Sequence, residues 1–244
     1  MQLTTATYTD VGRVRDRNED AVLCTPLEPL DGRLLAVADG MGAHRAGDVA
    51  SETAIETVQD SVGRYRGKRS VRAVLREGIE TANTRLQSLA QADPSRAGLG
   101  TTLVAAIVTG DEITIANVGD SRAYLVGDGI TQVTTDQTVV QQLETEGVLS
   151  ADEAGTHPHR HVLTQALGTT DDIAPEWVDA DLGDRTLLLC SDGLTEEVSD
   201  AEIEAIVRRE SEPATTAERL VDRANRNGGS DNISVVLARR SDGA

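Results

Sequence analysis

Short aliphatic runs, bounded by Gly, Asp and Ser, recur along the chain and predict β-strands. The expected strands are residues 34–38, 102–108, 113–118, 123–126, 187–190 and 233–238. Between residues 101 and 135 the runs are joined by the links TGDE, GDS and GDG. Links this short connect neighbouring antiparallel strands, so we predict a β-meander in this part of the chain.

Apolar residues at helical spacing mark three further segments. They are residues 49–62, residues 71–89, and residues 203–224, which Pro213 divides. Groups of antiparallel strands separated by long helices predict an α+β fold in which helices cover the sheets, rather than a parallel βαβ sheet. No repeat or linker interrupts the pattern, so we expect one domain over residues 1–244. The polar segment 137–165 has a weak helical signal and is expected to be a surface insertion.

The composition adds two facts to this picture, an aliphatic core and a strongly negative net charge. Phe is absent and the aromatic residues are three Tyr and one Trp, so the core must be aliphatic. The net charge is −18, which makes nucleic acid and anionic membranes unfavourable partners. Lys68 is the only lysine, and this combination resembles the proteins of halophilic archaea. Because salt screens carboxylate repulsion, we expect a loss of structure at low ionic strength that circular dichroism would detect.

Cysteines and apolar segments bear on the location of the protein. Cys24 and Cys190 are too few for a disulfide framework, and neither lies in a metal-binding pattern. We interpret Cys190 as a small buried hydrophobic residue. The amino-terminal residues lack a signal-peptide pattern, and no run approaches the ~18 apolar residues of a membrane span. We therefore expect a cytoplasmic protein.

Carboxylates occur where two aliphatic strands end. LLAVADG (34–40) ends in Asp39-Gly and LLLCSDG (187–193) ends in Asp192-Gly, and acidic residues occur again in NED (18–20) and GGSDN (228–232). Each of these sequences alone is typical of a turn or a helix start. Together, clustered carboxylates repel one another unless cations lie between them. Oxygen ligands favour a hard cation, magnesium or manganese.

The order of the motifs is more specific than any one of them. They are GRVRDRNED (12–20), VADGMGAHRAGDVAS (37–51), LGTTLVAAIV (99–108), NVGDSRAYL (117–125), LTQALG (163–168), LCSDGLTEEVSD (189–200) and SDNISVVL (230–237). This series resembles the type-2C protein phosphatases, the metal-dependent serine/threonine phosphatase family. The resemblance implies a four-layer αββα sandwich, with two antiparallel sheets flanked by helix pairs and metal ions at one end.

The resemblance also implies a metal centre with two core ions of Mn²⁺ or Mg²⁺ and a third, looser ion. The residues carried over by position are Asp39, the Gly40 carbonyl, Asp192, Asp231, Glu19, Asp20 and Asp120. Asp39 would bridge the two core ions, and Asp120 would help Asp192 to hold the third. Two adjacent cations acidify a bridging water, so a hydroxide would attack the phosphate in line without a phosphoenzyme intermediate.

Two further residues complete the implied mechanism. Arg15 would bind two oxygens of the phosphate through its guanidinium fork. His44 would protonate the departing serine or threonine oxygen. The expected partners are phosphorylated proteins and a serine/threonine kinase that acts on the same proteins, and we expect a monomer.

The sequence departs from the family pattern at two positions, and it leaves alternatives open. Ala43 replaces the usual Gly before His44, and Gln137 replaces a common His where the insertion, here called the flap (residues 137–165), begins. The flap contains HPHRH (157–161), for which a zinc or nickel site and a polar surface loop are both conceivable. The alternatives to a protein phosphatase are an inactive binding module, an enzyme for small phosphoesters, and a nuclease, which the charge disfavours.

Overall fold

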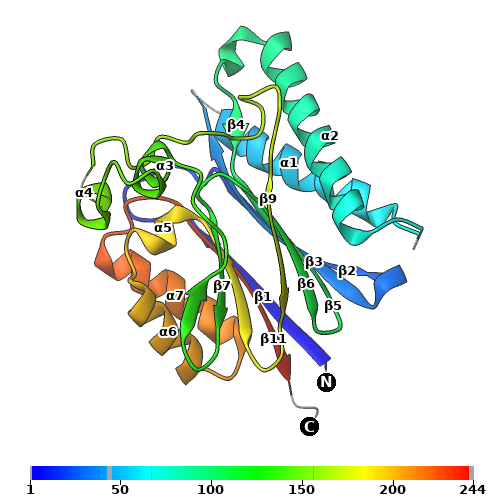
Figure 1. The fold of residues 1–244 in the computed structure, drawn as a ribbon, viewed down its shortest axis with the longest axis vertical. Coiled ribbons are helices and arrows are strands. Elements are labelled where there is room, and N and C mark those ends of the chain that lie inside the picture. The colour runs from blue at the N-terminus through cyan, green and yellow to red at the C-terminus, as the bar shows by residue number, and fades with distance from the viewer. Residues whose placement is uncertain (1, 43–45, 67, 156, 242–244) are drawn as a thin grey trace.

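Two antiparallel sheets form the centre of the molecule, as the computed structural model shows for residues 2–42, 46–66, 68–155 and 157–241 (Figure 1). The first sheet has the order β1 (Gln2–Asp10), β11 (Ile233–Ser241), β10 (Thr186–Cys190), β7 (Arg122–Val126) and β8 (Ile130–Gln132). The second has the order β2 (Asp20–Leu27), β3 (Gly32–Met41), β5 (Leu103–Thr109), β6 (Glu112–Val118) and β9 (Glu176–Asp181), and β4 (Gly100–Thr101) pairs with β3.

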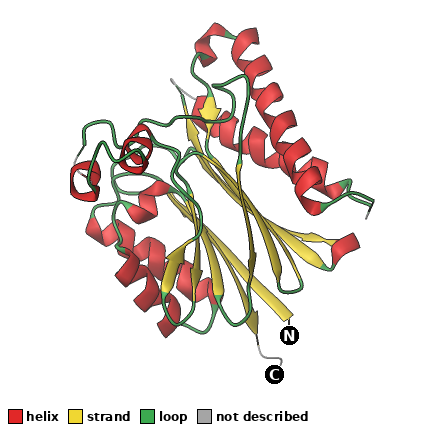
Figure 2. Cartoon of the chain, viewed as in Figure 1, coloured by secondary structure: helices red, strands yellow, loops and turns green. Residues whose placement is uncertain are grey.

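A helix pair covers the outer face of each sheet (Figure 2). The second sheet is covered by α1 (Ala46–Gly63) and α2 (Val71–Ala92), and the first by α6 (Asp200–Arg209) and α7 (Pro213–Asn227). The shorter helices are α3 (Val139–Thr145), α4 (Ala151–Gly155), α5 (Asp192–Thr195), and the 3₁₀ turns η1 (Glu28–Leu30) and η2 (Pro94–Arg96). This four-layer αββα sandwich confirms the predicted fold class.

Alternating side chains of β3 build two different cores. Leu34, Ala36 and Ala38 face the helix pair α1–α2, whereas Leu35 and Val37 face the other sheet, and all five are fully buried. Side chains on a strand point alternately to its two faces, so a continuous apolar run fits a strand that is buried on both faces. The aliphatic run that ends at Asp39 is therefore a consequence of the four-layer packing.

Side-chain caps fix where two of the covering helices begin. The Ser70 hydroxyl accepts a hydrogen bond from the Ala73 N–H at the start of α2. At the start of α6, Ser199 and Glu202 form a reciprocal capping box. Each cap satisfies N–H groups that the first turn of a helix leaves unpaired. Within the described ranges, no helix is both long and apolar enough to cross a membrane.

The predicted meander is wrong at one link. The strands β5 and β6 pair with each other, and so do β7 and β8, but the GDS link between β6 and β7 leads from the second sheet into the first. Gly119 in this link has a φ of +103°, and a Cβ there would lie 2.7 Å from the Thr102 side chain. Only glycine allows this close crossing, so the link changes sheets instead of forming a hairpin.

Candidate active site

One cavity at an end of the sandwich collects carboxylates from five separate segments, one of which carries Glu19, just before β2. Asp39 lies near the end of β3, Asp192 follows β10, Asp231 precedes β11 and Asp120 lies between β6 and β7. The cavity has a volume of about 520 Å³. Among the residues that line it are seven of the predicted site residues, namely Arg15, Glu19, Asp39, Gly40, Asp120, Asp192 and Asp231. The tertiary structure thus brings together residues that lie up to 216 positions apart in the sequence.

Asp39 is held in place through its backbone. Its N–H donates to the Thr102 hydroxyl at 3.0 Å, and its carbonyl accepts from the Thr102 N–H at 2.9 Å and from the Thr101 hydroxyl at 2.8 Å. Thr101 and Thr102 are both buried. These contacts fix the strand end and leave the carboxylate of Asp39 to the cavity, so Thr101 and Thr102 position Asp39.

Asp20 lies behind Asp39 on the neighbouring strand. The two residues are direct partners in the register of β2 and β3. The hydroxyl of Ser191 donates to Asp20 Oδ2 at 2.8 Å, whereas the buried Asp20 Oδ1 has no hydrogen-bond partner among the described residues. Asp192 Oδ1 is buried and unpartnered in the same way. A buried carboxylate oxygen without a donor is costly, and a cation would satisfy it.

Burial and mutual repulsion raise the pKa values of these carboxyl groups. Burial raises the pKa of Asp20 to about 7, with smaller contributions from Asp192 and Asp231. Burial and repulsion by Asp192 raise the pKa of Asp120 to about 8. The pKa of Asp39 lies well above its ordinary value because the group is buried and faces Asp20. Without a cation, these groups cannot all be ionised at neutral pH.

Glycines leave room for a close approach of backbone atoms beside Asp39. A Cβ on Gly40 would lie 2.0 Å from the Gly47 carbonyl oxygen, and a Cβ on Gly47 would lie 2.7 Å from the Glu19 carboxylate. The Gly40 N–H donates to the Glu19 carbonyl at 3.1 Å. The glycines of this loop therefore let the start of α1 pack against Gly40 and Glu19. The predicted residues His44 and Ala43 lie outside the described residues.

Arg15 lies at the mouth of the cavity. Its Nη2 donates to Asp231 Oδ2 at 2.6 Å, and its side chain is 54% exposed. Asn232 fixes the segment that carries Arg15, because its Nδ2 donates to the carbonyls of Val11 and Arg17 and its Oδ1 accepts from the Glu19 N–H. The sequence alone indicated no role for Asn232 or Ser191. The one feature of the sequence that could have indicated them is their position in the motifs, where Asn232 follows Asp231 and Ser191 precedes Asp192.

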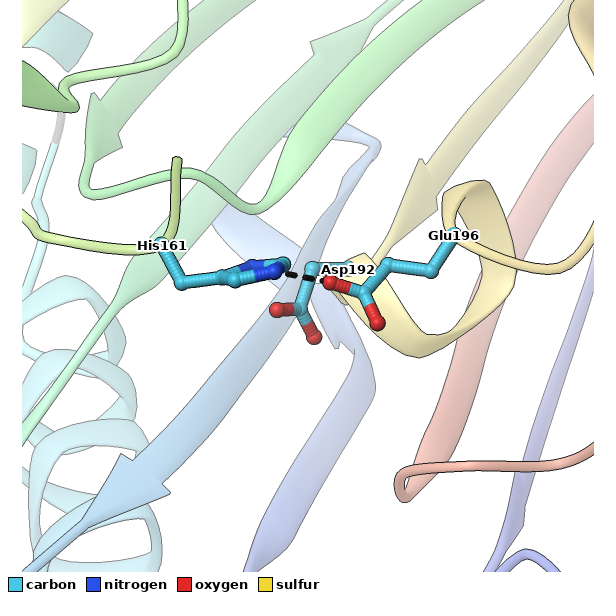
Figure 3. A group of neighbouring side chains, drawn as sticks. All are labelled: His161, Asp192 and Glu196. Atoms are coloured by element: carbon cyan, nitrogen blue, oxygen red, sulfur yellow. Dashed lines mark ion pairs between the residues drawn. The ribbon is translucent and has the colours of Figure 1, made fainter. Parts of the chain in front are cut away.

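The flap reaches the cavity with His161 and with residues 163–165. His161 Nδ1 lies 2.8 Å from Glu196 Oε1, and the two side chains approach each other across Asp192 (Figure 3). One ligand atom from each of these three residues lies within 4.8 Å of the others. A second cavity of about 550 Å³ lies between the flap and α5, and Asp120, His161 and Asp192 line both cavities. His161 thus joins the site, although the motif comparison did not assign it.

The three histidines of HPHRH do not converge on one point. The rings of His157 and His159 are 5.5 Å apart between centroids and tilted by 51°, whereas His161 contacts Glu196 on α5. In the described part of the chain, the candidate metal-binding group that includes a flap histidine is His161 with Asp192 and Glu196. A zinc or nickel site made of the three histidines alone therefore has no support in this geometry.

Gln137 joins both ends of the flap to the link that carries Asp120. Its Oε1 accepts from the Gly119 N–H at 2.7 Å, and its Nε2 donates to the Asn117 carbonyl at 3.3 Å. Its own carbonyl accepts from the Thr164 N–H at 2.8 Å and from the Thr164 hydroxyl at 3.0 Å. A neutral amide provides a donor and an acceptor at once, so Gln137 makes both contacts with the link.

We expect Gln137→Leu to loosen the base of the flap. The substitution keeps the shape but leaves the buried Gly119 N–H without its side-chain acceptor, which should lower the free energy of unfolding by ~1–3 kcal/mol. Trypsin should also cut faster after Arg160, an exposed residue of the flap. Denaturant unfolding and timed proteolysis would measure both effects. Gln142→Leu, on exposed α3, is the control, and equal behaviour of the two variants would contradict this role.

An αββα sandwich with a carboxylate-lined cavity at one end is typical of one class of metal-dependent hydrolases. The comparison with known proteins places the chain within this class. A family model for protein phosphatase 2C matches residues 13–237. The chain belongs to the protein phosphatase 2C family.

Relatives of known activity align over nearly the whole chain. Serine/threonine phosphatase stp of Listeria innocua is 38% identical over 239 residues, which cover 96% of this chain and 94% of that protein. Serine/threonine protein phosphatase PstP of Mycobacterium tuberculosis is 40% identical over 237 residues. That alignment covers 96% of this chain and 44% of PstP, so this chain corresponds to less than half of PstP.

Solved structures agree with the fold. The serine/threonine phosphatase of S. agalactiae superposes with a TM-score of 0.93 at 32% identity, covering 98% of this chain and 100% of that chain. The catalytic domain of PstP in complex with two manganese ions has a TM-score of 0.86 at 36% identity, covering 98% and 99% of the two chains. The family expected from the order of the motifs is therefore confirmed.

Proposed function

We propose that this chain hydrolyses phosphoserine and phosphothreonine in proteins, and that its cavity holds two ions of Mn²⁺ or Mg²⁺ with room for a third. The observation that carries the proposal is the pair of buried, unpartnered oxygens on Asp20 and Asp192, in a cluster whose burial raises its pKa values. Divalent cations fit this donor set because it consists of oxygens. Family membership and the named relatives support the reaction.

Each carboxylate has a place in this proposal. Asp39 and the Gly40 carbonyl would hold one core ion, with Asp39 shared between the two ions. Asp192 and Asp231 would hold the other ion. Glu19 and Asp20 belong to the same cluster, as direct ligands or through water. When bound, such ions activate water and neutralise the phosphoryl oxygens.

A third ion would lie beside Asp192 on the side of the flap. Asp120 contributes a carboxyl group whose pKa is raised by burial and by Asp192. His161 and Glu196 offer two more ligand atoms next to Asp192. We propose that Asp120 and Asp192 hold this ion and that His161 brings the flap close to it.

Arg15 would orient the phosphate. Its guanidinium is half exposed at the mouth of the cavity and already contacts Asp231, so it can donate to phosphoryl oxygens next to the metal-binding carboxylates. His44 stays a candidate general acid on the strength of its sequence position alone.

Substitution of Arg15 with lysine is expected to lower kcat/KM for a phosphopeptide by about 10–100-fold, because an ammonium cannot form the two parallel hydrogen bonds of a guanidinium fork. Metal content should not change, since Arg15 is not a ligand. Steady-state kinetics and metal analysis would check both statements. Arg13→Lys, at a neighbouring exposed position, is the control. Unchanged kinetics in Arg15→Lys would contradict the assignment.

The proposal also covers the domain organisation, the oligomeric state and the location of the protein. We propose a single catalytic domain whose residues 137–165 form a flap beside the cavity, with α3 and α4 within it. We also propose a cytoplasmic monomer that opposes a serine/threonine kinase. The thiols of Cys24 and Cys190 are unpaired, which fits a reducing compartment. Sedimentation and cell fractionation would test the monomeric state and the location.

The test of the function is hydrolysis of a phosphothreonine peptide with and without manganese. A protein phosphatase should release phosphate from the peptide only with metal, and should prefer it to a small aryl phosphate. Equal or better turnover of the small ester would favour the small-phosphoester alternative. No turnover by folded, metal-loaded protein would favour a binding module.

A further inference from the structure

A basic segment stands out from an otherwise acidic chain. Residues 64–76 contain six cationic side chains and no Asp or Glu. The whole chain carries −18 and this segment carries +6, so the other residues carry −24. The cationic residues are Arg64, Arg66, Lys68, Arg69, Arg72 and Arg76. We call residues 64–66 and 68–76 the basic turn, because they lie between α1 and α2 and in the first turns of α2.

Four of these side chains have partners within the fold. Arg66 donates to the carbonyls of Gly63 and Tyr65, at the negative end of the α1 dipole. Arg69 pairs with Glu77. The guanidinium groups of Arg72 and Arg76 lie over the Trp177 ring, 5.0 and 5.3 Å from its centroid. The fold therefore accounts for these four cations.

The fold does not account for the other two. The side chains of Arg64 and Lys68 are exposed and make no hydrogen bond or ion pair with the described residues. Both border a cavity of about 210 Å³ that Tyr65, Val74 and the Arg69–Glu77 pair also line. Two unpaired cations beside an apolar wall can bind an anionic group and its aliphatic stem together.

We propose that the basic turn is a docking surface for an acidic segment of a partner protein. Arg64 and Lys68 provide the unpaired positive charges, and Arg66, whose hydrogen bonds go to backbone carbonyls, adds to the local positive potential. A short run of carboxylates or phosphorylated residues has the complementary charge. The one carboxylate among the residues that line this cavity, Glu77, is already paired with Arg69.

The negative charge of the rest of the chain favours a short acidic peptide over an extended polyanion as the ligand of the basic turn. Duplex nucleic acid or an anionic membrane would cover a larger area and bring its own negative charge close to the −24 of the other residues. A peptide that occupies only the 210 Å³ cavity and its rim avoids most of that repulsion.

The docking surface lies far from the catalytic cavity. The helix α1 begins beside Gly40 and runs for 18 residues before it reaches the basic turn, a length of about 27 Å. In Figure 1 the turn lies at the right, whereas the flap helices α3 and α4 lie at the left. A partner could therefore dock while the cavity stays open.

The test is binding of a labelled peptide, measured by fluorescence anisotropy. The protein is the full chain with Asp39→Asn and manganese, so that phosphate groups survive the experiment. One probe alternates glutamate with serine, and the other is the same peptide with phosphorylated serines. The variant Arg64→Glu/Lys68→Glu reverses the two free charges, and Arg209→Glu/Arg226→Glu on α6 and α7 is the control with the same change in net charge.

We expect charge reversal in the basic turn to weaken peptide binding by about tenfold or more, with little effect of the control pair. Added salt should weaken binding by the parent protein. Binding of both probes would assign the site to carboxylates as well as phosphates, and binding of the second probe alone would assign it to phosphates. The variant Arg64→Gln/Lys68→Gln removes the two charges without reversing them, and we expect it to lose less binding affinity than the charge reversal does. It tests the proposal even if charge reversal disturbs folding.

Three outcomes would overturn the proposal. The first is failure of both peptides to bind the parent protein. The second is an equal loss in the control variant, which would mean that total charge decides binding. The third is tighter binding of duplex DNA or phosphatidylserine vesicles through the same two residues. Because binding is measured without turnover, none of these outcomes depends on the proposed catalytic function.

Discussion

Substitution of Asp39 with asparagine is expected to lower the rate of metal-dependent phosphopeptide hydrolysis by a factor of at least about 1,000, or more than ~4 kcal/mol in the barrier. Asp39 lines the cavity and is the carboxylate proposed to lie between two cations. An amide cannot supply the same charge, so binding of the core ions should weaken as well. Phosphate release and metal content by mass spectrometry would measure the two effects together.

The same substitution should stabilise the metal-free protein. The Asp39 carboxylate faces Asp20 in a buried site, and a neutral side chain removes that repulsion. The backbone contacts of Asp39 with Thr101 and Thr102 do not use its side chain and should persist. We expect a gain of ~0.5–2 kcal/mol. Asp172→Asn, an exposed substitution, is the control, and full activity of Asp39→Asn would refute the metal-bridging role.

The metal-free protein is expected to lose stability as the pH rises from about 4 to 9, by several kcal/mol in total. Folding raises the pKa of Asp20 to about 7 and that of Asp120 to about 8, from an ordinary value of 3.8. The folded state therefore holds these protons more tightly than the unfolded state does. The stabilisation is complete below the ordinary value and is lost as the pH passes through the raised values.

Calorimetric unfolding across this pH range, with chelator and with manganese, would test the prediction. In chelator the melting temperature should fall by roughly 10 °C. With manganese the fall should be much smaller, because bound cations favour the ionised carboxylates. Asp120→Asn should flatten the curve in chelator, whereas Asp172→Asn should not. Parallel curves with and without metal would show that the cluster does not bind it.

These two predictions describe the same feature of the molecule. The site gathers carboxylates that destabilise one another in the absence of metal, and the proposed metal centre depends on that arrangement. Natural proteins accept such local costs at functional sites and offset them in their cores. Here three aliphatic cores lie between the four layers of the sandwich.

Much of the fold could be predicted from apolar periodicity. The run that ends at Asp39 and the stripes of α1, α2 and α7 are visible in the sequence because burial selects apolar residues at fixed spacing. Other elements could not be predicted in this way. The strands β1 and β9 were missed because they are only partly buried and their many polar residues mask the alternation, and β2 was missed because its apolar run covers only residues 21–24. The change of sheet at Gly119 depends on a contact with Thr102, which no local pattern reveals.

The sequence by itself determined the family, the identity of the metal-binding candidates and the excess of acidic over basic residues, because these depend on residue types and their order. Only the tertiary structure decided which of those residues meet. The approach of His161 to Asp192, the support of Asp39 by Thr102, and the anchoring of the flap by Gln137 each join segments far apart in the chain. The physical reason is that such contacts depend on how sheets and loops pack in three dimensions, and local spacing carries no information about that packing.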